Sequence, residues 1–343
     1  MSRLALVTGG SGYFGSLLVD RLLGSGRDVR ILDIRDSDDR RPETAFLEGD
    51  VRDPAAVRLA VDGVDEVFHN VAQVPLARDT ELFEEVNVTG TGNLLEACLD
   101  AGVEKVVHTS SSAVFGVPAT NPVLRDTEPH PMEAYGRAKY DAELLCRAAE
   151  TRGLDVTIIR PRTILGRGRL GIFGILFDWI ADGSAVPVLG DGRNVYQFVH
   201  AEDLASACVL AAEREGPATY NIGAERFGTM GEAVGHLCAY AGTGARVRPV
   251  PTTLTSKVME VSARLGLTPF GPYHWIMYGK SMWFDVADAR EELGWSAKWS
   301  NDEMLVDSYE WFLRHREVMP MGGSAHRTTA RQGALRLAKW ALR

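Results

Sequence analysis

The chain has 343 residues, of which 45% are hydrophobic and 24% are charged, so it can bury a large core and is unlike disordered or fibrous proteins. Its four cysteines are widely separated and form neither a CxxC pair nor a cluster with histidines, which argues against a disulfide framework and against a metal site. The formal net charge of -9 argues against a nucleic-acid partner.

The first half of the chain alternates short apolar runs with segments of helical periodicity. The runs are LALVTG, DVRILD, AFLEGD, DEVFHNVA and KVVHTSSS, and VTIIRP continues the series. Asp53 followed by Pro54 is a typical helix start for the segment between the third and fourth runs. This alternation predicts an α/β protein with a Rossmann-type, doubly wound parallel sheet that has helices on both faces.

After about Leu165 the alternation is less regular. The segment GIFGILFDWIADG predicts an apolar helix, VPVLGDGRN a strand and a turn, and HAEDLASACVLAAE a second helix. We therefore expect a sheet domain over residues 1–165 with returning segments near 195–225, and a smaller mixed α/β lobe over 166–318 that mainly binds substrate.

Residues 319–343 form a basic tail, with five Arg or Lys residues and no Asp or Glu from Pro320 onward. Arg336, Lys339 and Arg343 follow helical spacing among apolar residues, a pattern compatible with weak contact with an anionic membrane surface. A frayed tail, or a helix packed on the body or on a second subunit, is the simpler interpretation. The separated cysteines favour a reducing, cytoplasmic setting. No apolar stretch has the length of a membrane span or the pattern of a signal peptide.

The clearest binding signal is TGGSGYFG, between the first strand and the first helix. Gly9, Gly12 and Gly15 allow the backbone to turn sharply and to approach a pyrophosphate at a helix N-terminus. Asp33 ends the second predicted strand, where a carboxylate binds ribose hydroxyls and repels a 2'-phosphate, so we expect NAD rather than NADP. Arg35 can pair with such a phosphate and argues in the opposite direction.

A second signal is EAYGRAKYDAE, which places Tyr135 and Lys139 one helical turn apart. A secondary alcohol gives up hydride to a nicotinamide only as its proton leaves, so a base must lie within hydrogen-bond reach. The tyrosine pKa of about 10 falls near a cation, because positive charge favours the phenolate. The pair is either a surface contact or a proton-transfer site, and the glycine loop and the serines at 110–112 favour the second.

Several motifs in order resemble those of the extended short-chain dehydrogenases/reductases. Besides the glycine loop and YGRAK, they are GDVRD, HNVA, NVTGTGN, HTSSSAVFG, RPRTILGRG, FVHAEDLA, YNIG and ELGW. The resemblance implies that Ser111 is the catalytic hydroxyl, with Ser110 and Ser112 as less favoured neighbours, and that Tyr135 and Lys139 complete the trio. It also implies a homodimer, through helices that include residues 81–102 and 132–152.

The resemblance extends to the cofactor. It implies that Asp50 and Val51 contact the adenine, that Ala72 lines the cofactor channel and that Asn87 steadies that channel. The complete cofactor-binding set that we expect is Gly9, Gly12, Tyr13, Phe14, Gly15, Asp33, Arg35, Asp50, Val51, Ala72, Asn87, Tyr135, Lys139 and Pro161.

The family includes nucleotide-sugar epimerases, sugar dehydratases and dehydrogenases of sterols. Dehydratases usually have Thr-Asp-Glu after the catalytic strand, where this chain has Ser111, Ser112 and Ala113, so dehydration is disfavoured. SSSAVFG looks most like the epimerases, which oxidise a sugar hydroxyl, rotate the ketone and return the hydride to its other face. We therefore expect a 4-epimerase of the UDP-hexose type.

Three positions depart from the nucleotide-sugar pattern. Thr163 replaces a common asparagine, Tyr196 replaces an arginine that often binds the diphosphate, with Arg193 nearby, and Lys280 is the only full cation in GPYHWIMYGKSMWFD. The expected substrate-binding set is Ser111, Ser112, Thr163, Arg193, Tyr196 and Lys280. The same segments resemble the 3-beta-hydroxysteroid dehydrogenase branch, and the aromatic-rich lobe suits an apolar alcohol or ketone. A catalytically silent NAD-binding sensor is the third alternative, against which the trio argues.

Overall fold

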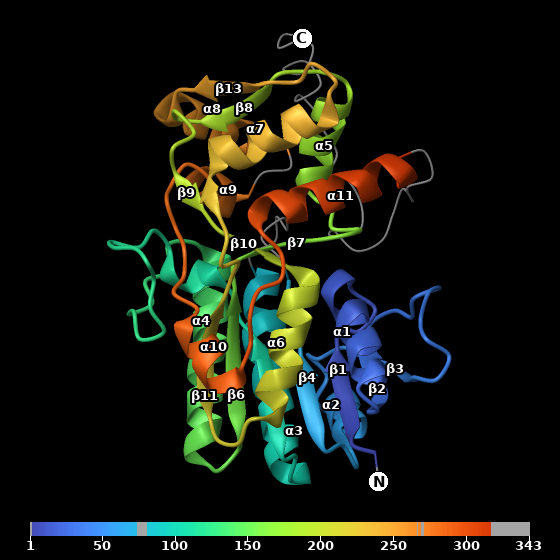
Figure 1. Ribbon diagram of the computed structural model, residues 1–343. Coiled ribbons are helices and arrows are strands. Elements are labelled where there is room, and N and C mark those ends of the chain that lie inside the picture. Colours follow the sequence, from blue (N-terminus) through green and yellow to red (C-terminus); the bar gives the residue numbers. More distant parts are fainter. Residues whose placement is uncertain (1, 74–80, 266, 269–270, 317–343) are drawn as a thin grey trace.

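A seven-stranded parallel sheet forms the larger part of the molecule. The computed structural model describes residues 2–73, 81–265, 267–268 and 271–316 (Figure 1). The strand order is β11-β6-β5-β4-β1-β2-β3, and every neighbouring pair is parallel. The strands are β1 (Leu4–Thr8), β2 (Asp28–Asp33), β3 (Ala45–Glu48), β4 (Glu66–His69), β5 (Lys105–Thr109), β6 (Val156–Pro161) and β11 (Ala218–Ile222). The predicted Rossmann-type sheet is confirmed.

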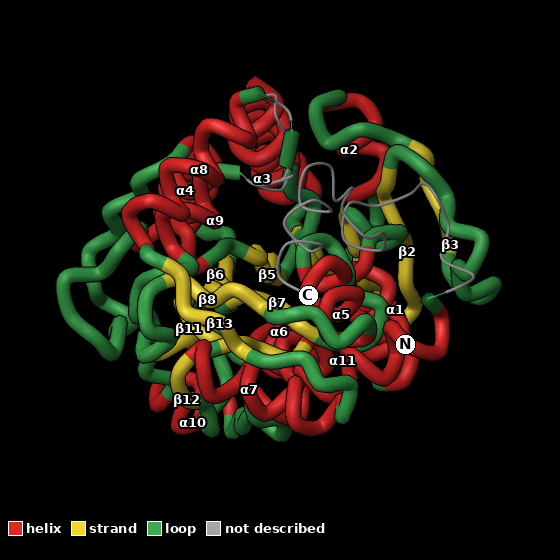
Figure 2. Tube along the Cα trace, turned by 90° about the horizontal axis from the view of Figure 1, so that it is seen from above, coloured by secondary structure: helices red, strands yellow, loops and turns green. Residues whose placement is uncertain are grey.

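Helices cover both faces of this sheet, as Figure 2 shows from above. Successive side chains of a strand point to opposite faces, so both must be apolar in a doubly covered sheet. In β1, Ala5 and Val7 join the core cluster on one side, and Leu6 joins the cluster on the other. The first side holds α1 (Tyr13–Gly24) and α6 (Ala201–Glu213), and the second holds α2 (Pro54–Val61), α3 (Gly90–Ala101) and α4 (Ala134–Thr151). A π-helical turn, η1 (Phe83–Thr89), leads into α3.

The helix start expected at Asp53 is present. The Asp53 side chain accepts a hydrogen bond of 2.9 Å from the backbone amide of Ala55, and Pro54 is the first residue of α2. The cap satisfies one of the amides that have no partner inside the helix, and proline has no amide to satisfy.

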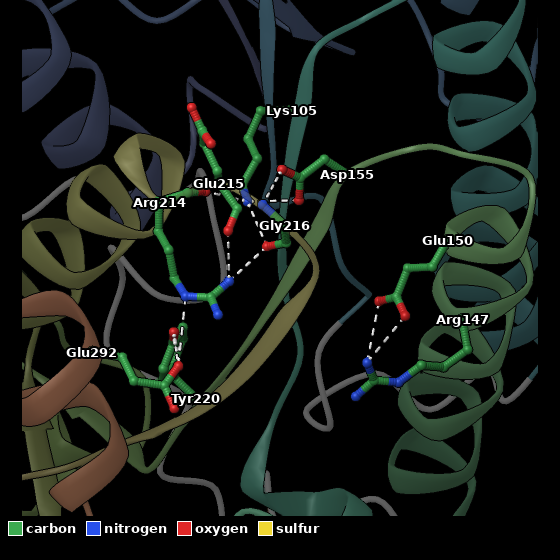
Figure 3. Close-up of polar contacts among 9 residues, drawn as sticks. All are labelled: Lys105, Arg147, Glu150, Asp155, Arg214, Glu215, Gly216, Tyr220 and Glu292. Carbon is green, nitrogen blue, oxygen red and sulfur yellow. Dashed lines mark hydrogen bonds and ion pairs between the residues drawn. The ribbon is translucent and has the colours of Figure 1, made fainter.

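A polar network around the buried Lys105 lies at the end of the sheet where β5 and β6 begin (Figure 3). Lys105 is 3% exposed, and its Nζ donates to Asp155 Oδ1 and to the carbonyl oxygen of Arg214, each at 2.7 Å. The amide of Gly216 donates to the second oxygen of Asp155, and Glu292 lies 3.5 Å from Arg214. Because β5 begins at Lys105, this lysine lies at the opposite end of the strand from the serines at 110–112. Its hydrogen bonds fix the loop before β11.

A smaller mixed lobe lies beyond the carboxyl ends of the strands (Figure 1). It contains α5 (Phe173–Ala181), β8 (Val186–Leu189), α7 (Met230–Ala241), β13 (Val247–Val250), α8 (Thr252–Arg264), α9 (Pro272–Met277) and α11 (Asn301–His315). Two short pairs of strands lie between the large sheet and the lobe. They are β7 (Thr163–Leu165) with β10 (Phe198–His200) and β9 (Val195–Tyr196) with β12 (Gly228–Thr229). Helix α10 (Ala287–Leu293) returns to pack on β11 and α6.

The lobe confirms the expected fold class, a doubly wound sheet with a smaller mixed lobe. The domain boundaries at residues 165 and 318 stay predictions, and the basic tail at 319–343 lies outside the described residues. Within the described ranges, no helix combines the length and the apolar character needed to cross a bilayer.

Candidate active site

The carboxyl ends of the parallel strands meet at the edge of the sheet that faces the lobe (Figure 1). The glycine loop follows β1, Asp33 ends β2, and the serines at 110–112 follow β5. Residues that are distant in the sequence therefore gather at one edge, which is the usual position of a ligand in an open α/β sheet.

The glycine loop has the geometry that its sequence predicts. Gly9 has a φ of +72°, a conformation that L side chains rarely adopt, and its amide donates to the carbonyl oxygen of Leu32 at 2.9 Å. A Cβ at Gly15 would lie 2.0 Å from the carbonyl oxygen of Gly9, so only glycine fits there. Helix α1 begins at Tyr13, and its cap residue Gly12 offers no side-chain hydrogen bond. The first amides of α1 are therefore suited to an anionic ligand.

Asp33 lies directly beside this loop. Its Oδ2 accepts a hydrogen bond of 3.1 Å from the backbone amide of Ser11. Burial raises the pKa of Asp33, while hydrogen bonds from the amides of Ser11, Ile34 and Arg35 oppose that rise. The Arg35 side chain is exposed. A partly buried carboxylate next to a pyrophosphate loop is the geometry expected for a ribose-binding acid.

The predicted adenine contacts, Asp50 and Val51, follow directly after the end of β3. The Asp50 carboxylate pairs with Arg52 at 2.7 Å and borders an open pocket of about 420 Å³ that Glu85 and Thr89 also line. Val51 is buried and packs closely against Gly90 at the start of α3. Their adenine contacts stay predictions.

Asn87 holds the segment that follows Ala72. Its Oδ1 accepts a hydrogen bond of 2.8 Å from the amide of Gln73, and its Nδ2 donates to the carbonyl oxygen of Gln73 at 3.1 Å. Asn87 is 1% exposed, whereas Ala72 is half-buried. Both backbone groups of Gln73 are thus fixed by one side chain, which suits the steadying role expected of Asn87.

Tyr135 and Ser111 are brought together, at the start of α4 and after β5. Tyr135 is 9% exposed, and the Ser111 hydroxyl lies near enough to affect the pKa of the phenol. The Glu133 carboxylate caps α4 and accepts hydrogen bonds from the amides of Tyr135 (2.8 Å) and Gly136 (2.6 Å). The phenol therefore lies on the first turn of a firmly capped helix.

The expected lowering of the Tyr135 pKa is wrong. Burial of the phenol raises the pKa of Tyr135 well above its usual value, and the Glu133 carboxylate adds to that rise. The Ser111 hydroxyl and the Arg169 cation lower it, but by less. Sequence spacing could not reveal this balance, because it depends on how deeply the tertiary packing buries the phenol.

Lys139 is almost fully buried one turn further along α4. It is 2% exposed, and its Nζ donates to the carbonyl oxygen of Thr109 at 2.7 Å. Burial lowers the pKa of Lys139 to about 8, against the opposing effects of Cys146 and Glu143. The ammonium is thus tied to the end of β5, close to Ser111.

The three serines after β5 have different partners. Ser110 donates to Glu143 Oε1 at 2.5 Å, inside a buried pair in which Arg160 lies 2.6 Å from the other oxygen of Glu143. The hydroxyl of Ser111 accepts from the amide of Ala113 at 3.1 Å, which caps the short 3-10 turn η2 (Ser112–Phe115). Ser112 accepts from Arg162 at 2.9 Å. Ser110 and Ser112 therefore stabilise the surrounding structure.

The expected substrate residues divide into two groups. Thr163 Oγ1 and the Tyr196 hydroxyl are 2.8 Å apart, and Tyr196 is 1% exposed at the junction with the lobe. The Arg193 side chain is 88% exposed and lies 3.7 Å from Asp191, and Lys280 is also exposed. The two cations are thus surface groups in this structure. Pro161, at the end of β6, is buried.

Two arginines of RPRTILGRGR were overlooked as candidate ligand-binding residues. Arg162 is 1% exposed and lies over the rings of Tyr196 (4.9 Å) and Phe284 (5.6 Å). Arg169 has a buried Nη1 and lies over the ring of Tyr13 at 5.8 Å. Neither has an ion-pair partner among the residues that the structure describes. Arginines are usually exposed, so a sequence alone gives no signal for such burial.

Comparison with known proteins gives relatives along nearly the whole chain. The model of the NAD dependent epimerase/dehydratase family matches residues 5–223. An uncharacterized protein of Sinorhizobium fredii, y4nG, is 49% identical over 99% of this chain and 87% of its own length. The UDP-glucose 4-epimerase of Mycolicibacterium smegmatis is 30% identical over 90% of this chain and 97% of its own. The human decarboxylating sterol-4-alpha-carboxylate 3-dehydrogenase is 33% identical over 61% of this chain and 57% of its own.

Solved structures share the fold. MoeE5, solved with UDP-glucuronic acid and NAD, superposes with a TM-score of 0.74 at 29% identity and covers 90% of this chain and 99% of its own. The UDP-glucose 4-epimerase of Thermotoga maritima, solved with UDP-glucose, gives 0.77 at 25% identity and covers 91% and 99%. The chain therefore belongs to the NAD-dependent epimerase/dehydratase family of enzymes, within the extended short-chain dehydrogenases/reductases.

Proposed function

We propose that the protein is an NAD-dependent 4-epimerase of a UDP-linked hexose-type sugar. The observation that carries the proposal is the Tyr135 phenol near the Ser111 hydroxyl, on the same helix as the buried Lys139. The glycine loop with its uncapped helix start lies at the same edge of the sheet. The epimerases of M. smegmatis and T. maritima, each similar over most of its length, support the nucleotide sugar as substrate.

Each part of the site has a role in this proposal. The amides at the start of α1 bind the pyrophosphate of NAD, and Asp33 binds the adenosine ribose. Bound NAD supplies the acceptor that takes the hydride and returns it. Tyr135 removes the proton of the sugar hydroxyl, and Ser111 donates a hydrogen bond to that oxygen. Lys139 binds the nicotinamide ribose.

Return of the hydride to the same carbon distinguishes an epimerase from a dehydrogenase. After proton and hydride have left, the substrate is a ketone that turns in the site and presents its other face. Tyr135 then gives the proton back to the oxygen as the hydride returns. No net oxidation results, so a catalytic amount of bound NAD is enough.

A 3-beta-hydroxysteroid-type dehydrogenase or ketoreductase is the second candidate. The human sterol dehydrogenase supports it, but the match covers only 57% of that protein. The aromatic residues of the lobe give it little support, because Phe177 is fully buried and packs against Tyr309 and Phe312 in the core. A catalytically silent sensor is the third candidate, and it does not explain why the trio is assembled.

Incubation with UDP-hexoses without added NAD(P)H separates these candidates. An epimerase converts UDP-glucose and UDP-galactose, or the corresponding acids, into an equilibrium pair with no lasting absorbance at 340 nm. A dehydrogenase accumulates reduced cofactor in proportion to product. If a broad panel of UDP-sugars and alcohols gives neither result, the sensor is the better account.

The proposal includes a preference for NAD over NADP, a cytoplasmic location and a homodimer. The dimer would use the surfaces of η1, α3 and α4, which pack together on one side of the sheet. The solved structures of MoeE5 and of other members of the fold contain NAD, which supports the choice of cofactor.

A further inference from the structure

Arg169 is a half-buried cation that has no counter-ion among the residues that the structure describes. It lies between β7 and α5, and its Nη1 is buried without a hydrogen-bond partner. Its Nε is 3.4 Å from the carbonyl oxygen of Ile164, at the limit of a hydrogen bond. Burial lowers the pKa of Arg169 to about 10, so the guanidinium is still charged at neutral pH.

Among the described residues, the ionisable groups that act on Arg169 are phenols and an imidazole rather than carboxylates. Its electrostatic neighbours are the phenols of Tyr13, Tyr135 and Tyr278, and burial raises the pKa of the last two. His274 also lies near it, and burial, followed by the Arg169 charge, lowers the pKa of that imidazole to about 4. The described neighbours of Arg169 are thus aromatic side chains.

Two other arginines of the same segment are paired with carboxylates, whereas Arg162 instead lies over the rings of Tyr196 and Phe284. Arg167, two residues earlier, donates to Asp307 Oδ1 at 2.8 Å, and Arg160 lies 2.6 Å from Glu143. A buried cation without a partner is costly, because the loss of hydration is not offset. Such a residue is explained when its counter-ion arrives with a ligand.

The neighbours of Arg169 show where that counter-ion would lie. Tyr13 belongs to the glycine loop, and Tyr135 is the proposed proton-transfer group. An anion on Arg169 is therefore close to the reacting hydroxyl. In a nucleotide sugar that reacts at C4, the diphosphate is attached to C1, across the ring from C4. The ring neighbours of C4 are C3, which carries a neutral hydroxyl, and C5, which carries C6, the position that is a carboxylate in a hexuronic acid.

We propose that Arg169 is a specificity-determining residue that binds a carboxylate at C6, so that the preferred substrate is a UDP-linked hexuronic acid. This inference rests on the proposed epimerase function and narrows its substrate. Arginine suits this role because its planar guanidinium binds both oxygens of a carboxylate. A neutral hydroxymethyl group in the same place would leave the buried charge unpaired.

The test measures binding of UDP-glucuronate, UDP-glucose and UDP to the NAD-loaded protein by calorimetry. Wild type should bind UDP-glucuronate at least about tenfold more tightly than UDP-glucose. Arg169→Met should weaken the binding of UDP-glucuronate at least about tenfold. It should change the affinities for UDP-glucose and UDP by less than about threefold. Arg169→Lys keeps the charge, so its affinity for UDP-glucuronate should lie between those of wild type and Arg169→Met. Arg167→Met is the matched control, since Arg167 is 58% exposed, and should behave as wild type.

Three results would overturn the inference. Equal wild-type affinity for the glucuronate and the glucose derivative would show that no carboxylate is recognised. If Arg169→Met loses the same affinity for all three ligands, with folding verified by thermal unfolding, Arg169 binds the diphosphate that they share instead of a carboxylate. If wild type binds none of the three, the proposed epimerase function fails together with the inference, whereas the first two results leave that function intact.

Discussion

The Glu133 carboxylate accepts hydrogen bonds from the backbone amides of Tyr135 and Gly136, at 2.8 and 2.6 Å. A buried acid thus fixes the first turn of the helix that carries the phenol. Burial raises the pKa of Glu133, and its negative charge in turn raises the pKa of Tyr135. Glu133 therefore affects the proposed base in two ways, by position and by charge.

Two substitutions at Glu133 should separate these effects. Glu133→Gln keeps an acceptor and removes the charge, so the pKa of Tyr135 should fall and the acid limb of the pH–rate profile should move to lower pH. Glu133→Ala removes the cap and should cost about 1 kcal/mol of stability with a loss of kcat. Ser300→Ala is the control. The Ser300 side chain caps α11 by accepting a hydrogen bond from the Glu303 amide, so its removal should cost a similar stability without the loss of activity. An unchanged pH profile in Glu133→Gln would show that the charge has no effect on the base.

Tyr135→Phe should remove the proton-transfer group and leave its surroundings in place. The phenol is 9% exposed and lies near Ser111, so the ring should still pack as before. Turnover should fall by at least about a thousandfold, within the range that a positioned acid–base group contributes, and NAD affinity should change little. Retention of turnover would remove Tyr135 from the mechanism.

Lys139 predicts a pH dependence of stability with a definite sign. Burial lowers the pKa of Lys139 to about 8, below the value of about 10.4 for an unfolded lysine. Between these values the unfolded chain binds more protons, so the wild-type stability should rise with pH across that window. Below about pH 8 the full cost of burying the charge is present.

Thermal or denaturant unfolding of wild type and Lys139→Met at pH 7 and pH 9.5 measures this effect. Relative to the variant, wild type should gain roughly 2 kcal/mol of unfolding free energy over the interval. Comparison of the two proteins cancels the other titrating groups. A difference that does not change with pH would mean that the folded state does not lower the pKa of Lys139.

The fold could be predicted because its signals are local and periodic. The apolar runs and helical segments of the first half identify the strands of the sheet, and the glycine loop marks where α1 begins. The position of Gly15 against the Gly9 carbonyl shows why that pattern is so restrictive. Order along the chain, rather than any one motif, identified Ser111, Tyr135 and Lys139 as candidates.

The site could be predicted only in part, because burial and charge balance arise from tertiary packing. Nothing in EAYGRAKYDAE shows that Glu133 caps the helix from a buried position or that burial raises the pKa of Tyr135. Likewise, the sequence does not distinguish Arg169 from other basic loop residues, because only the structure shows that its Nη1 is buried without a hydrogen-bond partner. The exposed Arg193 and Lys280 looked more suitable as anion-binding residues in the sequence than they do in the structure.

Asp33 should set the choice between NAD and NADP. It lies beside the glycine loop, where it accepts a hydrogen bond from the Ser11 amide at 3.1 Å. Asp33→Ser removes the charge that repels a 2'-phosphate and leaves Arg35 to pair with it, so NADP should bind at least about tenfold more tightly and NAD more weakly. Asp36→Ser, an exposed acid paired with Arg40, is the control. Unchanged NADP affinity in Asp33→Ser would show that Asp33 does not select the cofactor.

The most direct test of the epimerase proposal follows the hydrogen at the reacting carbon. The purified protein is incubated with a UDP-sugar, glucuronate or glucose, that carries deuterium at C4, and the product is analysed by NMR. Because the same hydride leaves and returns, the account predicts a C4-inverted sugar that keeps its deuterium at C4, with no lasting reduced cofactor. Transfer of the deuterium to free reduced cofactor, with a ketone as the product, would contradict it.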